Sequence, residues 1–250
     1  MAIACNEHAD GFQSANHERK STLTHALDNP FWSSLASRHR DISIRSGKAA
    51  RYPPDYAPFL GVADTAGVAE ADLQALVGSG ETVYLLGVAA SLSDAWQLEI
   101  DQPLTQMIRT SPIDLDEGTD IIELGLAHRE DAMALTALVY PHFFRSRTME
   151  LGRYFGIYRD GRLAAMIGER LGTDEFQEIS AVCTHPDFTC QGLAQRLLGM
   201  LTNDNLRRGR TPFLHVSRQN THAISLYERI GYTHRRNIDF WSLRRKSADA

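Results

Sequence analysis

The chain has 250 residues, which is enough for one large domain or two small ones. Apolar residues make up 43% of it and charged residues 23%, proportions that are ordinary for a soluble globular protein. The formal net charge is −5 and the pI is near 6.0, a balance that argues against a general nucleic-acid-binding protein.

Cysteine usage and apolar runs indicate the setting of the protein. Cys5, Cys183 and Cys190 show no metal-ligand spacing, so we expect no metal site and a reducing compartment. No apolar run approaches the length of a membrane span, and the first residues lack the basic start and apolar stretch of a signal peptide. We therefore expect a cytoplasmic protein that binds neither membranes nor nucleic acid.

Composition divides the chain into four parts. Residues 1–26 are polar and are expected to be poorly ordered. Residues 27–110 alternate helical and strand patterns and predict a small α/β unit, in which no chemical motif stands out. Residues 111–120 are acidic and rich in turn formers, which is typical of a linker. Residues 121–250 predict a second α/β domain.

Within the first unit, the clearest signal is a helix start. Asn29 followed by Pro30 is typical of a cap and a first helical residue, with Phe31 and Leu35 on the buried face. Beyond it, the pattern predicts a helix over 69–77 and strands over 59–63, 82–88, 96–100 and 104–108.

In the second domain, an Asp160-Gly161 turn between two apolar segments predicts a hairpin. Further helices are expected to begin at Gly192 and after Asn220. The remaining elements predicted by apolar periodicity are a helix over 128–140, a short helix over 149–151, and strands over 121–126, 155–158, 163–169, 176–184 and 212–216.

The stretch from residue 176 to residue 201 reads as strand, loop and helix. Pro186 and Asp187 stop the strand, and Gly192 opens a helix whose buried face consists of Leu193, Leu197, Leu198 and Leu201. The first turn of a helix leaves N–H groups without partners and carries positive partial charge, so this junction suits an anion. By itself, it is equally typical of an ordinary turn between a strand and a helix.

Two segments of the second half carry motifs with a fixed spacing. The first contains His185-Pro186-Asp187-Phe188 and Gly192-x-Ala194, and the second is Asn220-x-x-Ala223-x-x-Leu226-Tyr227-x-x-x-Gly231-Tyr232. Together they resemble the GNAT superfamily of acyl-CoA-dependent N-acyltransferases. The family usually has Arg or Gln where this chain has Thr189. Because backbone amides do not depend on that side chain, we expect cofactor binding to survive this departure.

The resemblance implies a mixed-sheet α/β acyltransferase domain over residues 121–250, similar in particular to the glycine N-acyltransferase-like subgroup. Residues 27–110 would then be a degenerate half of the same fold; a lid and a dimer-forming piece, which would make the protein a homodimer, are the alternatives. The implied reaction transfers an acetyl or other short acyl group from acyl-CoA to a primary amine of a small molecule or amino acid, by direct attack.

The resemblance also assigns acetyl-CoA, or another short acyl-CoA, to the strand–loop–helix stretch. The pyrophosphate would bind the backbone of Thr189, Cys190, Gln191, Gly192, Leu193 and Ala194. The pantetheine arm would lie along the backbone of Val182, Cys183 and Thr184. Asn220 lies where relatives contact the cofactor, and it is equally natural as the cap of the helix that follows.

Two residues are candidates for proton transfer. Glu178 lies on a mostly apolar strand, where desolvation is expected to raise its pKa and make it a general base; a solvated Glu at a strand edge is the alternative. Tyr227 would protonate the leaving thiolate by the resemblance, and a tyrosine that only packs the helix is the alternative. His185 belongs to a structural turn of the motif and is not a candidate.

The acceptor site is less defined by the sequence. By the resemblance it would be lined by His142, Phe143, Arg145, Arg147, Glu150 and Tyr154. Arg145 and Arg147 would suit an acceptor that carries a carboxylate, but surface arginines account for them equally well.

Three other functions remain as alternatives. A catalytically inactive acyl-CoA-binding regulatory module is supported by Thr189 and by the absence of motifs in residues 27–110. A protein N-acetyltransferase would have an open acceptor groove instead of a closed pocket. A dinucleotide-binding oxidoreductase is disfavoured, because no Gly-x-Gly-x-x-Gly follows a predicted strand.

Overall fold

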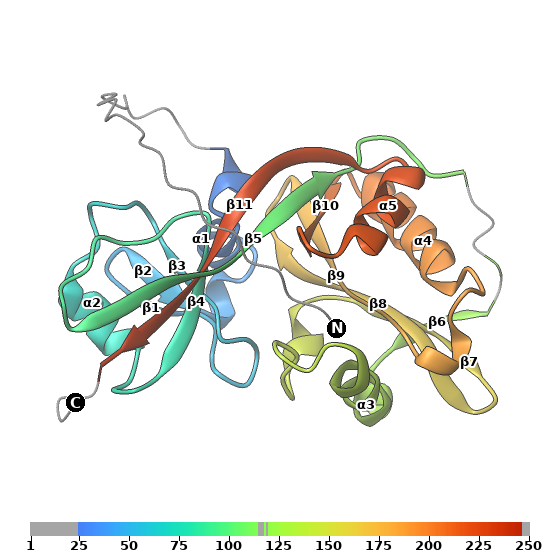
Figure 1. Ribbon diagram of the computed structural model, residues 1–250, viewed down its shortest axis with the longest axis horizontal. Helices are drawn as coiled ribbons and strands as arrows, with labels where there is room; N and C mark the ends of the chain where they lie inside the picture. The colour runs from blue at the N-terminus through green and yellow to red at the C-terminus, as the bar shows by residue number, and fades with distance from the viewer. Residues whose placement is uncertain (1–24, 115–117, 119, 247–250) are drawn as a thin grey trace, which may run out of the picture.

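A large mixed sheet organises the chain, of which the computed structural model describes residues 25–114, 118 and 120–246. Its eight strands lie in the order β4-β11-β5-β10-β9-β8-β7-β6 (Figure 1). They are β4 (Thr82–Leu86), β5 (Trp96–Ile108), β6 (Ile121–Leu124), β7 (Tyr154–Arg159), β8 (Arg162–Gly172), β9 (Phe176–Thr184), β10 (Thr211–Ser217) and β11 (Thr233–Arg245). Only β9 and β10 are parallel neighbours in this sheet. The predicted mixed α/β class is confirmed.

Strands β9 and β10 separate in the middle of the sheet. They pair only from Phe176 to Glu178, although β9 continues beside β8 as far as Thr184. The departing half of β9 contains a bulge at Ala181, whose φ of 51° is left-handed. That conformation costs an L-residue about 1–2 kcal/mol, and such strain gathers at functional sites. An opening between two strands is thus built into the sheet.

Helices cover both faces of the sheet beside this opening (Figure 1). Helix α4 (Leu193–Arg207) packs on β8, β9 and β10, and α5 (Thr221–Arg229) belongs to the same hydrophobic core. Helix α3 (Arg129–Val139) packs on β8 and β9 through a different core cluster. The predicted buried face of α4 is confirmed, because Leu197, Leu198 and Leu201 are fully buried. Within the described part of the chain, no helix is both long and apolar enough to cross a bilayer.

The predicted hairpin around Asp160-Gly161 is confirmed. It joins β7 to β8, and both turn residues have positive φ, 51° and 72°. Two positive values in succession are the geometry of a type I′ turn, which Asp-Gly favours.

Residues ahead of β4 form a smaller layer. Helices α1 (Pro30–Ala36) and α2 (Glu70–Leu76) pack on a three-stranded antiparallel sheet of β1 (Ile44–Ser46), β2 (Ala49–Arg51) and β3 (Leu60–Val62). Phe31 and Leu35 are buried as predicted. Asn29 and Pro30 stand at the predicted N-cap and first turn of α1, but the Asn29 side chain makes no capping bond: its Nδ2 donates to the Val62 carbonyl at 2.7 Å and so ties α1 to β3. The origin of this layer as a degenerate half of the fold stays a prediction.

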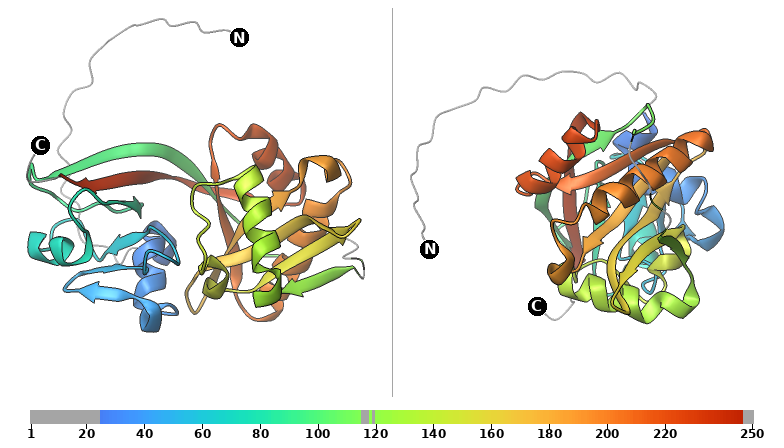
Figure 2. Two further views of the ribbon diagram at one scale, coloured as in Figure 1. Left: turned by 90° about the horizontal axis from the view of Figure 1, so that it is seen from below. Right: turned by 90° about the vertical axis from the view of Figure 1, so that its right-hand side faces the viewer.

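Strand β5 joins the smaller layer to the main sheet. The sequence predicts two strands, 96–100 and 104–108, and that is wrong: one strand of 13 residues runs through Pro103. Proline has no N–H to donate to a neighbouring strand. It is tolerated here because β10 pairs with β5 only from Leu104 onward, which leaves one side of the strand unpaired at Pro103. Strands β5 and β11 arch together across the molecule (Figure 2).

The main sheet therefore contains strands from both predicted units, 27–110 and 121–250. Strand β5 of the first unit lies between β10 and β11 of the second. Most of the segment predicted to be poorly ordered, residues 1–24, lies outside the described residues, as do residues 115–117 and 119 of the predicted linker.

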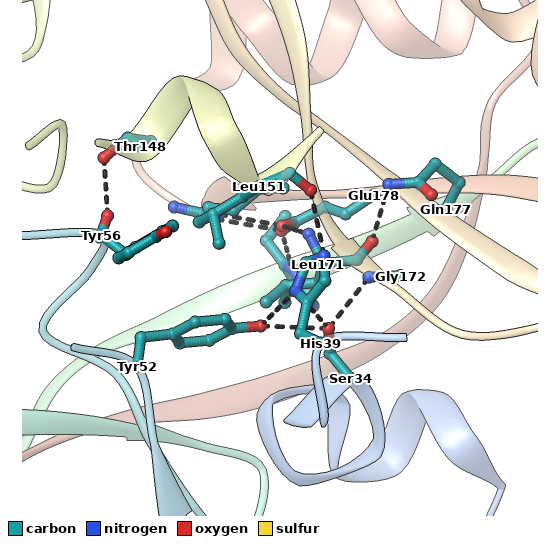
Figure 3. A network of polar contacts seen from close by, with 12 residues as sticks. Ser34, His39, Tyr52, Tyr56, Thr148, Leu151, Leu171, Gly172, Gln177 and Glu178 are labelled. Atoms are coloured by element: carbon teal, nitrogen blue, oxygen red, sulfur yellow. Dashed lines mark hydrogen bonds and ion pairs between the residues drawn. The ribbon is translucent and has the colours of Figure 1, made fainter. Parts of the chain in front are cut away.

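A buried polar junction fastens the smaller layer to the rest of the molecule (Figure 3). The His39 Nε2–H donates to the Leu151 carbonyl at 3.0 Å, and its Nδ1 lies 2.8 Å from the Tyr52 hydroxyl. Ser34 Oγ accepts from the Gly172 amide at 3.0 Å. Since a carbonyl only accepts, Nε2 of His39 carries a hydrogen, and it is the burial of the ring that favours its neutral form. Burial, opposed in part by the Leu151 bond, lowers its pKa to about 4.

The stability of this junction is expected to depend on pH. The unfolded chain protonates His39 near its ordinary pKa of 6.5 and the folded chain only near 4, so the stabilisation is complete above 6.5 and is lost as pH falls toward 4. Between pH 7.5 and pH 5 the free energy of unfolding should fall by about 2 kcal/mol through His39. Urea titrations of wild type and His39→Gln measure this difference. Equal pH dependence in both proteins would show that His39 is not its source.

Candidate functional site

A pocket of about 800 Å³ lies where β9 and β10 separate. Its walls come from α3, α5, both parted strands, and elements on the N-terminal side of the chain. The part of the chain from Ile179 to Cys183 forms one wall, and the part from His215 to Ser217 forms the facing wall. The strands β9 and β10, which separate beyond Glu178, therefore also form two sides of the cavity.

Helix α5 and its N-cap form one part of the pocket lining. Asn220 caps this helix, with its Oδ1 accepting from the Ala223 amide at 3.0 Å, and both residues line the pocket. The capping interpretation of Asn220 is confirmed, and its contact with a cofactor stays a prediction.

Tyr227 projects from α5 to the same pocket. It is 8% exposed, and its hydroxyl makes no hydrogen bond to any residue that the structure describes. Burial raises the pKa of its phenol, so Tyr227 stays protonated throughout the neutral range. A protonated hydroxyl in a cavity that has no protein partner is able to donate to a bound group.

The β9 wall presents backbone and small side chains. Val182 and Cys183 line the pocket, whereas Thr184 pairs with Ala165 on β8 at the end of the strand. Burial raises the pKa of the Cys183 thiol to about 12, so it is a thiol and not a nucleophilic thiolate. The β9 backbone in this stretch has no β10 partner and is available to a ligand that lies in the opening.

The loop that follows β9 leads to the N-terminus of α4. Gly192 stands at the N-cap with φ 72°, no side chain caps the helix, and a Cβ at this position would meet nothing within 4 Å. No described side chain occupies the first amides of α4 and Gly192 leaves the space beside it open, as an anion site requires. Thr189 Oγ1 donates to the Pro186 carbonyl at 3.1 Å, so its side chain is held within the loop. The remaining predicted loop residues are Cys190, Gln191, Leu193 and Ala194, and their contacts with a cofactor stay predictions.

Glu178 does not have the environment predicted for a general base. It is fully buried, both carboxylate oxygens bind Arg170 at 2.9 and 3.0 Å, and His215 Nδ1 lies 2.7 Å from it. Burial alone would raise the pKa of Glu178, but Arg170 and His215 outweigh it and hold the pKa at about 2. The prediction of a raised pKa is wrong. A carboxylate held ionised in this way is a poor proton acceptor, which disfavours the base role, although that role itself stays a prediction.

The Arg170–Glu178 pair is part of a polar row that crosses five strands. His215 Nε2 accepts from the Gln106 side-chain amide at 2.9 Å, and Gln106 Oε1 accepts from Arg235 at 2.8 Å. Arg170 and His215 also line the pocket, and the sequence analysis missed both. A polar residue inside each apolar strand segment was the signal that could have found them.

The predicted acceptor residues are only partly brought together. Tyr154, His142 and Phe143 line the pocket, and the buried Tyr154 hydroxyl has no hydrogen-bond partner among the described residues. Arg145 and Arg147 are exposed and do not line it. The alternative of surface arginines fits them, because Arg147 pairs with Glu150 at 2.7 Å and stacks on a tyrosine outside the pocket.

Comparisons with known proteins agree with this geometry. The model of the FR47-like protein family matches residues 154–241. A putative acetyltransferase of the GNAT family from Novosphingobium aromaticivorans has a similar structure, with a TM-score of 0.82 and 32% identity over 90% of this chain and 100% of that one. A GCN5-related N-acetyltransferase from Kribbella flavida shares the fold at 13% identity, with a TM-score of 0.54 over 86% of this chain and 95% of that one. No curated protein matches the sequence.

Proposed function

The chain belongs to the GNAT family of acetyltransferases, and from this premise we propose that it is an N-acyltransferase. It moves an acetyl or other short acyl group from acyl-CoA to a primary amine of a small molecule or amino acid, as in the glycine N-acyltransferase-like subgroup. The observation that carries the proposal is the pocket between the parted strands, in which the protonated Tyr227 and the unpaired β9 backbone share one cavity.

The site residues fit acyl-CoA as a substrate. The open first turn of α4 suits the pyrophosphate, and the free edge of β9 suits the amides of the pantetheine arm. An acyl-CoA bound in this way has its thioester in the pocket near Tyr227. The amine nitrogen attacks the thioester carbon, a C–N bond forms and the C–S bond breaks. Tyr227 gives its proton to the departing sulfur, and the proton that the amine loses restores the phenol through water.

No carboxylate is needed to take the proton from the amine before attack. Arg170 and His215 hold Glu178 in its ionised form and make it a poor proton acceptor. We therefore propose that the ammonium group of the acceptor loses its proton to solvent and that the resulting free amine reacts. The pKa of the acceptor itself then controls the rate at low pH.

Thiol release from acetyl-CoA tests both the reaction and this pH dependence. With a primary amine, kcat/KM should rise about tenfold per pH unit below the pKa of the amine. Trifluoroethylamine, which is less basic than ethylamine but similar in shape, should move this limb to lower pH. A limb at the same pH for both amines would assign it to an enzyme group instead. Acetyl-CoA binding without release by any amine would favour the inactive regulatory module.

A small acceptor is favoured over a protein. Residues from the N-terminal side of the chain, among them Phe59 and Tyr84, add further walls to the pocket. A protein N-acetyltransferase needs an open groove for a peptide. Acetylation of a short peptide faster than that of any small amine would reverse this choice.

A further inference from the structure

Another part of the pocket lining is aromatic and is called here the aromatic wall: Phe31, Phe59, Tyr84, Phe143 and Phe240. Tyr84 and Phe240 stack at 5.1 Å with their planes 7° apart. Phe143 meets them edge-on, at 5.0 Å from Tyr84 and 5.6 Å from Phe240. Tyr84 and Phe143 are only half-buried, so these two rings offer free surface to the cavity. The pocket thus contains aromatic ring surface that no other described part of the protein covers.

This wall and the proposed chemistry belong to different parts of the pocket lining. Tyr227 belongs to the core around α4 and α5, whereas the wall belongs to a separate core around α1. Most of the wall comes from the N-terminal side of the chain and from β11, and Phe143 follows α3. A molecule that spans the cavity would therefore contact Tyr227 at one end and the wall at the other.

The charge at the wall favours an amine over the acyl chain of the donor. Asp101 on β5 is exposed, lines the pocket, and makes no ion pair with any described residue. Arg170 lies over the Phe59 ring at 5.0 Å, and Glu178 binds two of its nitrogens, so its charge is paired and the rings of Tyr84 and Phe143 are left to a ligand. A free carboxylate beside aromatic faces attracts an ammonium group, by charge and by cation–π interaction. An aliphatic amine arrives largely as this cation and then loses its proton to solvent.

We propose that the acceptor is an arylalkylamine, in which a short chain joins a primary amine to a planar apolar ring. The ring packs against Tyr84 and Phe143, Asp101 draws the cation into the cavity, and the amine reaches the thioester beside Tyr227. This inference rests on the proposed transferase function. It gives the N-terminal side of the chain a role in acceptor selection.

A comparison of amines tests the role of the wall. With acetyl-CoA saturating, kcat/KM for 2-phenylethylamine should exceed that for ethylamine at least about tenfold, and 2-cyclohexylethylamine, which is apolar but not planar, should fall between them. Phe143→Leu and Tyr84→Leu should each lower kcat/KM for 2-phenylethylamine by about tenfold. They should change that for ethylamine less than about twofold. Asp101→Asn should reduce kcat/KM for 2-phenylethylamine several-fold, and added salt should diminish the difference from wild type.

Phe176→Leu is the matched control, because Phe176 packs against the same core cluster but does not line the pocket. It should leave the ratio of the two amines unchanged. Equal rates for ethylamine and 2-phenylethylamine, or equal losses with both amines in the wall variants, would overturn the inference and leave the transferase function intact.

Failure of the transferase function itself has a different signature. If acetyl-CoA binds and no amine reacts, calorimetry of 2-phenylethylamine with the protein–CoA complex decides the inference. Binding that Phe143→Leu weakens and Phe176→Leu keeps supports the aromatic site. Absence of binding overturns it.

Discussion

Replacing Gly192 by Asp is expected to weaken acetyl-CoA binding at least about hundredfold. A carboxylate at the N-cap of α4 would occupy the space that the pyrophosphate needs, since nothing else lies within 4 Å of a Cβ there. Two unit charges about 4 Å apart repel by roughly 4 kcal/mol at an effective dielectric constant near 20, which exceeds the 2.8 kcal/mol or so of a hundredfold loss. Calorimetric titration with acetyl-CoA measures the effect.

Helix α4 offers its own control for this experiment. Gly209, just beyond the other end of the helix, has φ 71° against 72° for Gly192, and a Cβ there also meets nothing within 4 Å. Gly209→Asp therefore adds the same side chain at nearly the same φ, away from the proposed anion site. Gly192→Asn adds the same bulk without the charge and should cost less affinity than Gly192→Asp. Equal loss of binding in Gly192→Asp and Gly209→Asp would refute the assignment of the phosphate site.

The second large effect is expected from Tyr227→Phe. Removing a general acid lowers the rate of proton transfer by about 10²- to 10⁴-fold, so kcat should fall in this range. The ring itself stays, and the hydroxyl has no hydrogen-bond partner among the described residues, so folding and the Kd of acetyl-CoA should change little. Pre-steady-state measurement of thiol release separates the chemical step from release of the product.

Tyr232→Phe is the matched control for the loss of a buried tyrosine hydroxyl. The Tyr232 ring lies 6.1 Å from that of Tyr227, but its hydroxyl bonds Thr202 at 2.7 Å inside the core. This variant should lose about 1–3 kcal/mol of stability, because Thr202 is left unpaired, and should keep its kcat. If Tyr227→Phe keeps kcat as well, Tyr227 only packs its helix.

Local patterns predicted the elements around the site well. Strand β9 has the predicted bounds, the Asp-Gly turn forms the predicted hairpin, and the leucines of α4 are buried as predicted. In each case neighbouring residues determine the result, through side-chain alternation, turn chemistry or helical periodicity. The Gly192 N-cap belongs to the same group, because its left-handed φ is a local requirement.

Interactions between distant residues account for what the sequence did not reveal. Two strands were predicted where β5 is one, and only the pairing of this strand with β10 and β11 shows why Pro103 is tolerated inside it. Glu178 was expected to be a desolvated base, but Arg170 on a neighbouring strand and His215 on the other side reverse the direction of its pKa shift. No local pattern indicates which cation will lie beside a buried carboxylate.

The aromatic wall is the clearest example at the site. Phe31, Phe59, Tyr84, Phe143 and Phe240 come from five separate segments of the chain, and each by itself is typical of an ordinary core residue. Only the fold shows that they share one surface of a cavity and that two of them remain half-exposed. By the resemblance, Phe143 was predicted to line the acceptor site, but the four wall residues outside that segment were not.

The arch of β5 and β11 also constrains the order in which the protein is made. Strand β5 is complete at Ile108, yet its two neighbours, β10 and β11, begin only at Thr211 and Thr233. Until they emerge, β5 has two open edges, which are prone to pairing with other chains. Such non-local pairing is slow to form, since long loops must close before any contact is made. The sheet of this protein is therefore completed only after translation has reached its last strand.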